Sequence, residues 1–197
     1  MPSHDHLFMV RPHLENVPEA ATPAGFLLRS YQSGDEREWL EIVRSAYGDV
    51  WGDNAFDRCT RSDETFRPER LFFVALGARL VGAVGAFQKL IHGDRTGYVH
   101  MLAVRPDFRR RGLGSALLRR CLRSFREAGW KDAVLDTDTR HPEAVRLYLS
   151  HGFLPFPETQ TELAVWANLL PSLGWERLAG ELRLRALPGD GRSRRSP

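Results

Sequence analysis

The segment Arg109-Arg110-Arg111-Gly112-Leu113-Gly114-Ser115 follows an apolar run and opens an amphipathic one, and its residue types suit an anion-binding turn. Glycines at 112 and 114 let the backbone come close to a ligand, and the first N–H groups of a helix have no partner inside that helix. Arg109 and Arg110 add positive charge at the same helix end, where the helix dipole also favours an anion. We therefore expect a phosphate or pyrophosphate to bind here.

The same residues argue against three other sites of similar composition. A P-loop requires Lys directly after its second glycine, where this chain has Ser115. A dinucleotide fingerprint requires a third glycine, at the position of Leu117. A nucleic-acid surface interleaves basic and aromatic side chains, whereas these arginines share one turn and the formal net charge is only +3. The turn therefore indicates a pocket for a phosphate-bearing small molecule.

The composition predicts a globular protein. Hydrophobic residues make up 42% and charged residues 27% of the 197 positions, enough for one domain with its own core. Cys59 and Cys121 are too few for a disulfide framework and lack metal-ligand spacing, so we predict no metal. No apolar run has the length of a signal-peptide core or a membrane span. We expect a cytoplasmic protein with no membrane or nucleic-acid partner.

Hydrophobic periodicity and turn residues predict the elements that position the turn. Strands are expected at 25–29, 71–76, 80–87, 98–104 and 133–138, with helices after Asp35, over 113–128 and from Pro142 to just before Gly152. The tight turn at 77–79 predicts an antiparallel hairpin. Hairpin strands first and helix-linked strands later imply a mixed sheet with helices on both faces.

The domain organisation is predicted from composition. Residues 1–24 are expected to form a partly flexible N-terminal extension, 25–187 the domain, and 188–197 a disordered basic tail. The stretch 158–187 fits a strand or a helix, and the stretch 47–70 is expected to hold a second helix and loops.

Two motifs in the right order resemble the GNAT superfamily of N-acetyltransferases. Arg109-x-x-Gly112-x-Gly114 follows the strand Met101-Leu102-Ala103-Val104, and the segment 141–153 is similar to the family pattern Asn-x-x-Ala-x-x-x-Tyr-x-x-x-Gly-Phe. The resemblance implies an α/β (α+β) GNAT fold. Its central sheet is mixed and mostly antiparallel, with a splayed pair of parallel strands and helices on both faces. His141 departs from the pattern, which prefers asparagine, although histidine is able to cap a helix.

The resemblance also implies acetyl-CoA as co-substrate. Its pyrophosphate would contact the turn, and its pantetheine arm would pair with the backbone of the preceding strand, through Leu102 and Val104. The cofactor-binding residues implied are Leu102, Ala103, Val104, Arg109, Arg110, Arg111, Gly112, Leu113, Gly114, Ser115, His141, Ala144 and Tyr148. Backbone N–H groups from Arg111 to Ser115 would donate to the pyrophosphate.

Acetyl transfer to an amine needs a base for the ammonium and an acid for the departing thiolate. Tyr148 stands on the motif tyrosine and is the candidate acid. For the base, strict alternation would put Tyr98, His100 and Leu102 on one face of their strand, with His100 next to the thioester and with an ordinary imidazole pKa. A carboxylate acting through water, Asp136 or Asp138, is the alternative base.

The residues expected to bind the acceptor are implied by the resemblance. By resemblance, specificity lies in 47–70, where Trp51, Asp53, Phe56, Asp57, Arg58 and Arg61 would line a cleft, and in a late hairpin after Phe156. We predict a primary amine of a small molecule as acceptor. A protein or peptide acceptor, N-terminal or lysine, and a non-catalytic acyl-CoA-binding module are the alternatives. Residues 158–187 are a candidate dimer interface.

Overall fold

A computed structural model describes residues 6–89, 91 and 93–185 of the chain. These residues divide into two compact units, one of residues 10–135 and one whose described residues are 6–9 and 136–185. The predicted tail at 188–197 lies outside the described residues.

The Val10–Leu135 unit holds most of the sheet. Its elements are β2 (Leu27–Ser30), α1 (Glu36–Tyr47), the π-helix η1 (Asp57–Arg61), the 3-10 helix η2 (Pro68–Arg70), β3 (Leu71–Leu76), β4 (Arg79–Gln88), β5 (Thr96–Val104), the 3-10 helix η4 (Pro106–Phe108), α2 (Leu113–Glu127) and the start of β6 (Asp132–Asp138). The strands predicted for this part and the helices predicted after Asp35 and over 113–128 are present. In place of the second helix expected in 47–70, the chain forms the π-turn η1 and the short η2.

The strand pairing confirms the hairpin and the mixed sheet. β3 and β4 pair antiparallel up to Leu76↔Arg79, around the positive φ of Gly77. β2 and β5 continue the antiparallel part on either side. β5 and β6 pair in parallel, and within this unit that pairing ends at Tyr98↔Val134 although β5 continues to Val104. Among the described residues of this unit, the backbone pairing with β6 therefore does not extend to the residues of β5 that follow Tyr98.

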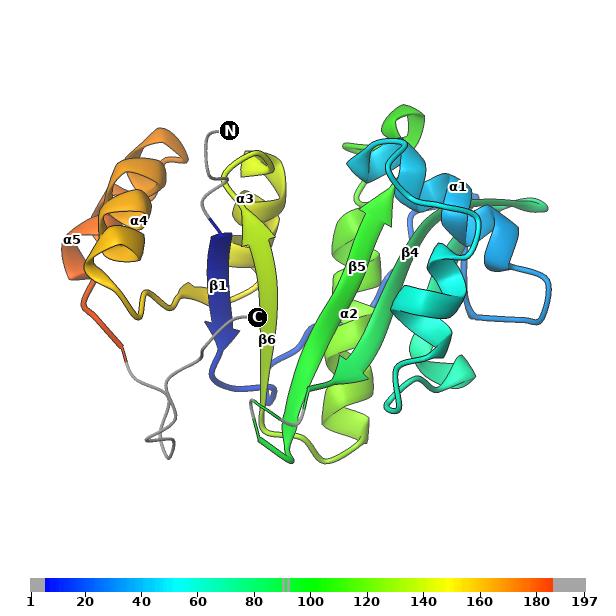
Figure 1. The fold of residues 1–197 in the computed structure, drawn as a ribbon, viewed down its shortest axis with the longest axis horizontal. Helices are drawn as coiled ribbons and strands as arrows, with labels where there is room; N and C mark the ends of the chain where they lie inside the picture. The colour runs from blue at the N-terminus through cyan, green and yellow to red at the C-terminus, as the bar shows by residue number, and fades with distance from the viewer. Residues whose placement is uncertain (1–5, 90, 92, 186–197) are drawn as a thin grey trace. The chain divides into compact units, whose positions relative to one another are not determined.

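Helices cover both faces of this part of the sheet (Figure 1). α1 buries Trp39, Ile42 and Val43 in a cluster with strand residues such as Phe73 and Ala103. α2 packs on the opposite face, as its apolar stripe predicts. The approach is close: a Cβ at Gly97 would lie only 2.4 Å from the Phe125 ring, so this position of β5 requires glycine.

The other unit contains most of β1 (His6–Arg11), the end of β6, α3 (Pro142–Ser150), β7 (Leu154–Pro155), α4 (Gln160–Ser172) and α5 (Glu176–Glu181). β1 lies inside the stretch predicted as an N-terminal extension. The strand order of the sheet is β2-β3-β4-β5-β6-β1-β7.

The segment after Phe156 corrects one expectation. Instead of a late hairpin, the chain forms α4 and α5. α4 starts with a capping box in which Thr159 accepts from the N–H of Glu162 while the Glu162 carboxylate accepts from the N–H of Thr159. This reciprocal pair satisfies two N–H groups and favours a helix over a strand here.

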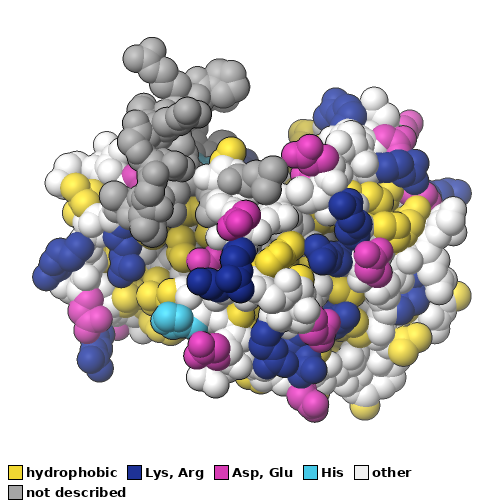
Figure 2. Space-filling view, turned by 90° about the horizontal axis from the view of Figure 1, so that it is seen from below, with side chains coloured by type: hydrophobic (Ala, Val, Ile, Leu, Met, Phe, Trp, Pro, Cys, Tyr) yellow, Lys and Arg dark blue, Asp and Glu magenta, His cyan; other side chains and the backbone are white. Residues whose placement is uncertain are grey.

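The surface carries both charges. Figure 2 shows Lys and Arg interspersed with Asp and Glu over the face that it draws. Among the described helices, none combines the length and hydrophobicity needed to cross a membrane. With a formal net charge of only +3, the sequence gives no strong overall field that would attract anions, so local geometry matters more for anion binding.

Candidate active site

The predicted turn leads directly into a helix, with free donors at its start. Gly112 is the N-cap of α2 and adopts a left-handed conformation (φ 79°) that glycine favours. No side chain caps this helix end. The backbone N–H groups from Arg110 to Gly114 have no acceptor among the described residues. The turn therefore presents a run of unsatisfied donors at the positive end of the helix dipole.

The three arginines of the turn differ in what they contact. Arg109 donates through Nε to the carbonyl of Val104 at 3.1 Å, tying the turn to the end of β5. Arg111 donates to the carbonyl of Asp107 at 3.3 Å, and its guanidinium lies over the Phe108 ring. In the described part of the chain, Arg110 has no such partner. Its side chain is exposed and its φ is 58°, a conformation uncommon outside glycine. Arg110 is the arginine most available to a phosphate.

A β-bulge interrupts β5 just before the turn. Gly85 lies opposite His100 and Ala83 lies opposite Ala103, so three steps along β5 match two along β4. Met101 takes a positive φ of 50° at this point. The bulge overturns the expected alternation: His100 shares a face with Ala103, and Leu102 points to the other face.

Tyr47 is a site residue that sequence reasoning missed. It ends α1, and its hydroxyl donates to the carbonyl of Leu102 at 2.6 Å. The ring is half-buried beside Trp51, with ring centroids 6.5 Å apart. Tyr47 thus fixes the backbone of the bulge from the α1 side. A carbonyl has two lone pairs, so this bond leaves Leu102 capable of a further main-chain contact.

His100 lies on the α1 face in an apolar, aromatic setting. Its ring stacks on Phe87 with centroids 4.5 Å apart and planes 15° from parallel. Burial, reinforced by the positive charge of Lys89, lowers the pKa of His100 to about 4. The expectation of an ordinary imidazole pKa is therefore wrong. His100 is neutral at physiological pH, with one ring nitrogen free of a proton.

The hydrogen bonding of His100 indicates which nitrogen that is. Nε2 is buried and has no hydrogen-bond partner in the described residues. The ring interacts with the backbone of Cys59 in a way that raises its pKa, as donation to a carbonyl does. The donor is then Nδ1–H, and Nε2 carries the lone pair.

The hydrogen-bond pattern of the π-helix η1 leaves the carbonyl of Cys59 available as an acceptor. In this turn, Ser62 N–H bonds the carbonyl of Asp57 and Asp63 N–H bonds that of Thr60. Cys59 lies between Asp57 and Thr60 in the sequence, and its carbonyl accepts neither of these two hydrogen bonds. Single π-turns inside helical segments are frequent at functional sites.

Three further buried polar atoms of the described residues lack partners on this side of β5. They are Nε1 of Trp39, Nε1 of Trp51 and Oγ1 of Thr60. Trp51 packs beside Tyr47, and Thr60 follows Cys59. Together with Nε2 of His100 they form a set of unsatisfied groups on one side of β5. Buried polar groups normally have partners, so these atoms are candidates for contacts that the described residues do not supply.

The other residues expected to line the acceptor cleft are mostly engaged elsewhere. Phe56 is a core residue, stacked on Tyr31 with centroids 5.6 Å apart. The charged residues of this set are exposed at the surface, and Asp57 pairs with Arg61 at 2.7 Å. Asp53 pairs with Arg44 at 3.0 Å.

His141, Ala144 and Tyr148 lie in the other unit, grouped by α3. His141 is the N-cap residue of α3, but its side chain makes no capping hydrogen bond. Ala144 is half-buried in the first turn. Tyr148 is buried, with its ring edge-on to Phe153 at 5.8 Å between centroids.

The two alternative bases are both in ion pairs. Asp136 lies 2.9 Å from Nε2 of His6. Asp138 pairs with Arg140 at 2.6 Å, and the hydrogen bond from this guanidinium lowers the pKa of Asp138. A carboxylate held ionised by an arginine is a weaker proton acceptor, so this pairing disfavours Asp138 as the base.

The family follows from the order of these elements and from a direct comparison. The model of the acetyltransferase (GNAT) family matches residues 36–153, from the start of α1 to the end of the α3 motif. The chain belongs to this family. Among the described residues of this GNAT chain, no three histidine, cysteine or acidic side chains are grouped so as to hold a metal ion.

Individual proteins that the chain resembles are also named acetyltransferases. A mycothiol acetyltransferase of Thermomonospora curvata is 31% identical over 142 residues, which are 70% of this chain and 47% of that protein. N-alpha-acetyltransferase 30 of Xenopus laevis is 31% identical over 91 residues, 44% of this chain and 32% of its own length. The GCN5-related N-acetyltransferase of Sphaerobacter thermophilus has a similar structure, with a TM-score of 0.63, 25% identity, and 79% of this chain and 49% of that one covered. The chain spans about half the length of the mycothiol acetyltransferases it matches.

Proposed function

We propose that this GNAT chain is an acetyl-CoA-dependent N-acetyltransferase that moves the acetyl group directly from the CoA thioester to a primary amine of a small molecule. The observation that carries the proposal is the run of unpartnered N–H groups from Arg110 to Gly114, placed directly after a bulged strand that holds a neutral His100. An anion site and a proton acceptor on consecutive elements suit a phosphate-bearing acyl donor and an amine acceptor.

The residues present fit acetyl-CoA. The N–H groups of Arg110 to Gly114 would hold the pyrophosphate, with Arg110 as the free guanidinium and Ser115 in the first turn of the helix. Ala103 and the main chain of Leu102 and Val104 would run beside the pantetheine arm. His141 and Ala144 stand on the motif positions of α3. The bound thioester supplies an activated acetyl group.

His100 would serve as the base. Because the pKa of His100 is about 4, its ring is neutral at physiological pH, and Nε2 can accept a hydrogen bond from the incoming amine. Such a weak base takes the proton only when the amine nitrogen becomes acidic, as its bond to the acetyl carbon forms. Fixing Nδ1–H on Cys59 keeps Nε2 in the accepting tautomer throughout.

Tyr148 would serve as the acid. Its hydroxyl would donate a proton to the sulfur while the carbon–sulfur bond breaks, so that CoA leaves as a thiol. The support for this role is its position in the family motif and its burial in α3.

The acceptor class rests on two observations. Nε1 of Trp51 and Oγ1 of Thr60 lie unpartnered on the His100 side of β5 and would meet polar groups of a compact ligand. Seven of the curated relatives are named mycothiol acetyltransferases, which supports a small-molecule acceptor. The shorter match to N-alpha-acetyltransferase 30 keeps a peptide N-terminus as the second candidate.

An acceptor screen tests the proposal. The purified chain is incubated with acetyl-CoA and a panel of amino sugars, arylalkylamines, amino acids, aminoacyl conjugates and peptides, and acetylated products are measured by mass spectrometry. We expect product with a small amine at a kcat/KM well above that for any peptide. A preference for peptides, with no small amine acetylated, would contradict the proposed acceptor class and favour the second candidate.

A further inference from the structure

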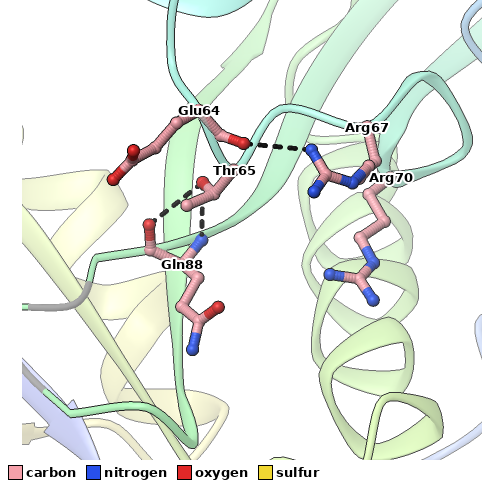
Figure 3. A pocket seen from close by; sticks show the side chains of 5 residues that line it. All are labelled: Glu64, Thr65, Arg67, Arg70 and Gln88. Atoms are coloured by element: carbon pink, nitrogen blue, oxygen red, sulfur yellow. Dashed lines mark hydrogen bonds between the residues drawn. The ribbon is translucent and has the colours of Figure 1, made fainter.

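A second pair of arginines lies in the segment between η1 and β3. Arg67 and Arg70, with Glu64, Thr65 and Gln88, line a hollow of about 250 Å³ (Figure 3), which we name the η2 pocket. Arg67 directly precedes η2 and Arg70 ends it, so the pocket is built on the short helix that leads into β3.

The positive charge of the η2 pocket is not balanced within it. Arg70 is half-buried and, in the described part of the chain, has neither a hydrogen-bond acceptor nor a carboxylate partner. Arg67 donates only through Nη1, to the carbonyls of Glu64 and Phe66, so its Nε and Nη2 groups remain available. In Figure 3 the Glu64 carboxylate points away from both guanidinium groups.

Two other half-buried arginines of the same unit have carboxylate partners, whereas Arg119 and Arg123, like Arg70, have none among the described residues. Arg29 pairs with Asp35 at 2.7 Å, and Arg105 pairs with two glutamates at 2.9 and 3.1 Å. Removing a guanidinium from water without an anionic partner is unfavourable. Arg70 stands beside Arg67 in one hollow, so the two uncompensated guanidinium groups together favour an anionic partner from outside the chain.

The η2 pocket is held rigidly enough to select such a partner. The Arg70 guanidinium lies 4.9 Å from the centre of the Trp130 ring, and Arg70 N–H donates to the carbonyl of Arg67 at 2.9 Å. Thr65 links the loop to β4 by accepting from the N–H of Gln88 at 3.2 Å. A guanidinium stacked by its face keeps its in-plane N–H groups free for a carboxylate or phosphate.

Size and position distinguish the η2 pocket from the pyrophosphate turn. At about 30 Å³ per water, its volume of about 250 Å³ equals roughly eight waters, which suits a small oxyanion rather than a nucleotide. Trp130 lies beyond the C-terminal end of α2 and Gly112 at its start, and the 15 residues of α2 rise by about 22 Å. One phosphate group cannot occupy both places.

We propose that the η2 pocket is a second anion-binding site, which takes a small carboxylate- or phosphate-bearing molecule between Arg67 and Arg70. Calorimetric titration of the full chain with inorganic phosphate and with citrate, at constant ionic strength in chloride, tests this directly. Arg70→Gln is the main variant, and Arg123→Gln is the matched control, since it removes the same charge from α2 outside the η2 pocket.

We expect saturable binding of at least one probe, weakened about tenfold or more in Arg70→Gln, because a charge-assisted contact is lost. Arg123→Gln should bind as the wild type does. Arg110→Gln, which weakens only the turn, should keep the binding that Arg70→Gln loses. The probe that binds assigns the ligand to the carboxylate or the phosphate class. If Arg70→Gln fails to fold by circular dichroism, the exposed Arg67→Gln takes its place.

The proposal is overturned if neither probe binds saturably, if Arg123→Gln weakens binding as much as Arg70→Gln, or if Arg110→Gln abolishes it. None of these outcomes bears on acetyl transfer, because the titration contains no acetyl-CoA and measures no turnover.

Discussion

The hydroxyl of Tyr47 donates a hydrogen bond of 2.6 Å to the carbonyl oxygen of Leu102. This bond joins the end of α1 to the bulge of β5, where Met101 holds a positive φ of 50°. A strained backbone persists when its surroundings hold it in place. We infer that Tyr47 keeps the bulge in the geometry that the acyl-transfer site requires.

Replacing Tyr47 by phenylalanine tests this inference. Tyr47→Phe leaves the Leu102 carbonyl without its donor, and we expect a loss of about 1 kcal/mol in the free energy of unfolding. Turnover should fall at least several-fold as the bulge relaxes. Tyr31→Phe is the control, since it also loses a side-chain hydrogen bond, to Glu36, without touching β5. Equal turnover in the two variants would contradict the role of Tyr47.

The arginines of the turn should differ in their effect on donor binding. Arg110→Gln removes the free guanidinium, and loss of a charge-assisted bond of about 1.5–3 kcal/mol should weaken CoA binding by about tenfold or more. Arg111→Gln should have a much smaller effect, because that side chain is held by Asp107 and Phe108. Titration calorimetry with CoA measures both, and the reverse order would refute the assignment of Arg110.

The pKa of His100 predicts a pH dependence of stability. The folded-state value of about 4 lies below the ordinary 6.5, so the unfolded chain takes up this proton first as the pH falls. Stability from the neutral ring is complete above pH 6.5 and is lost as the pH falls towards 4. The difference corresponds to about 3 kcal/mol.

Denaturant unfolding of the wild type and of His100→Gln between pH 7 and pH 4 isolates this effect. The wild type should lose more stability than the variant over this range, because only the wild type carries the imidazole. Parallel curves for the two proteins would show that His100 titrates normally. The plot of kcat/KM against pH for the wild type should also show no change in slope above pH 5 that is due to protonation of His100.

Tyr148 should affect chemistry rather than donor binding. We expect Tyr148→Phe to lower kcat by about tenfold or more, the range of general acid catalysis, with little change in the Kd for acetyl-CoA. His151→Gln at the end of the same helix, where the ring bonds the Leu147 carbonyl at 2.9 Å, controls for disturbance of α3. A smaller loss in kcat for Tyr148→Phe would remove it as the acid.

Local sequence patterns were sufficient for much of this fold. The strands from Leu71 to Val104, the hairpin at Gly77 and the helix after Gly112 follow from periodicity and turn residues, and the structure confirms them. The motif spacing was enough to identify the family, since both motifs depend on residues close together in the chain.

Features that depend on distant contacts were not predictable in this way. The β5 bulge is a register shift against β4, and periodicity within β5 alone placed Leu102 on the wrong face. The bond from Tyr47 to Leu102 spans 55 residues, and the shifted pKa of His100 arises from burial that no local pattern encodes. The capping box at Thr159 was visible in the sequence and could have identified α4 as a helix.

The most direct test of the account measures thiol release and acetylated amine together, with acetyl-CoA and the best acceptor of the screen. If the chain transfers acetyl groups to amines, CoA thiol is released only when an amine is present, in an amount that matches the acetylated amine one for one. Saturable binding of acetyl-CoA with no thiol released by any amine would contradict it and would show an acyl-CoA-binding module instead.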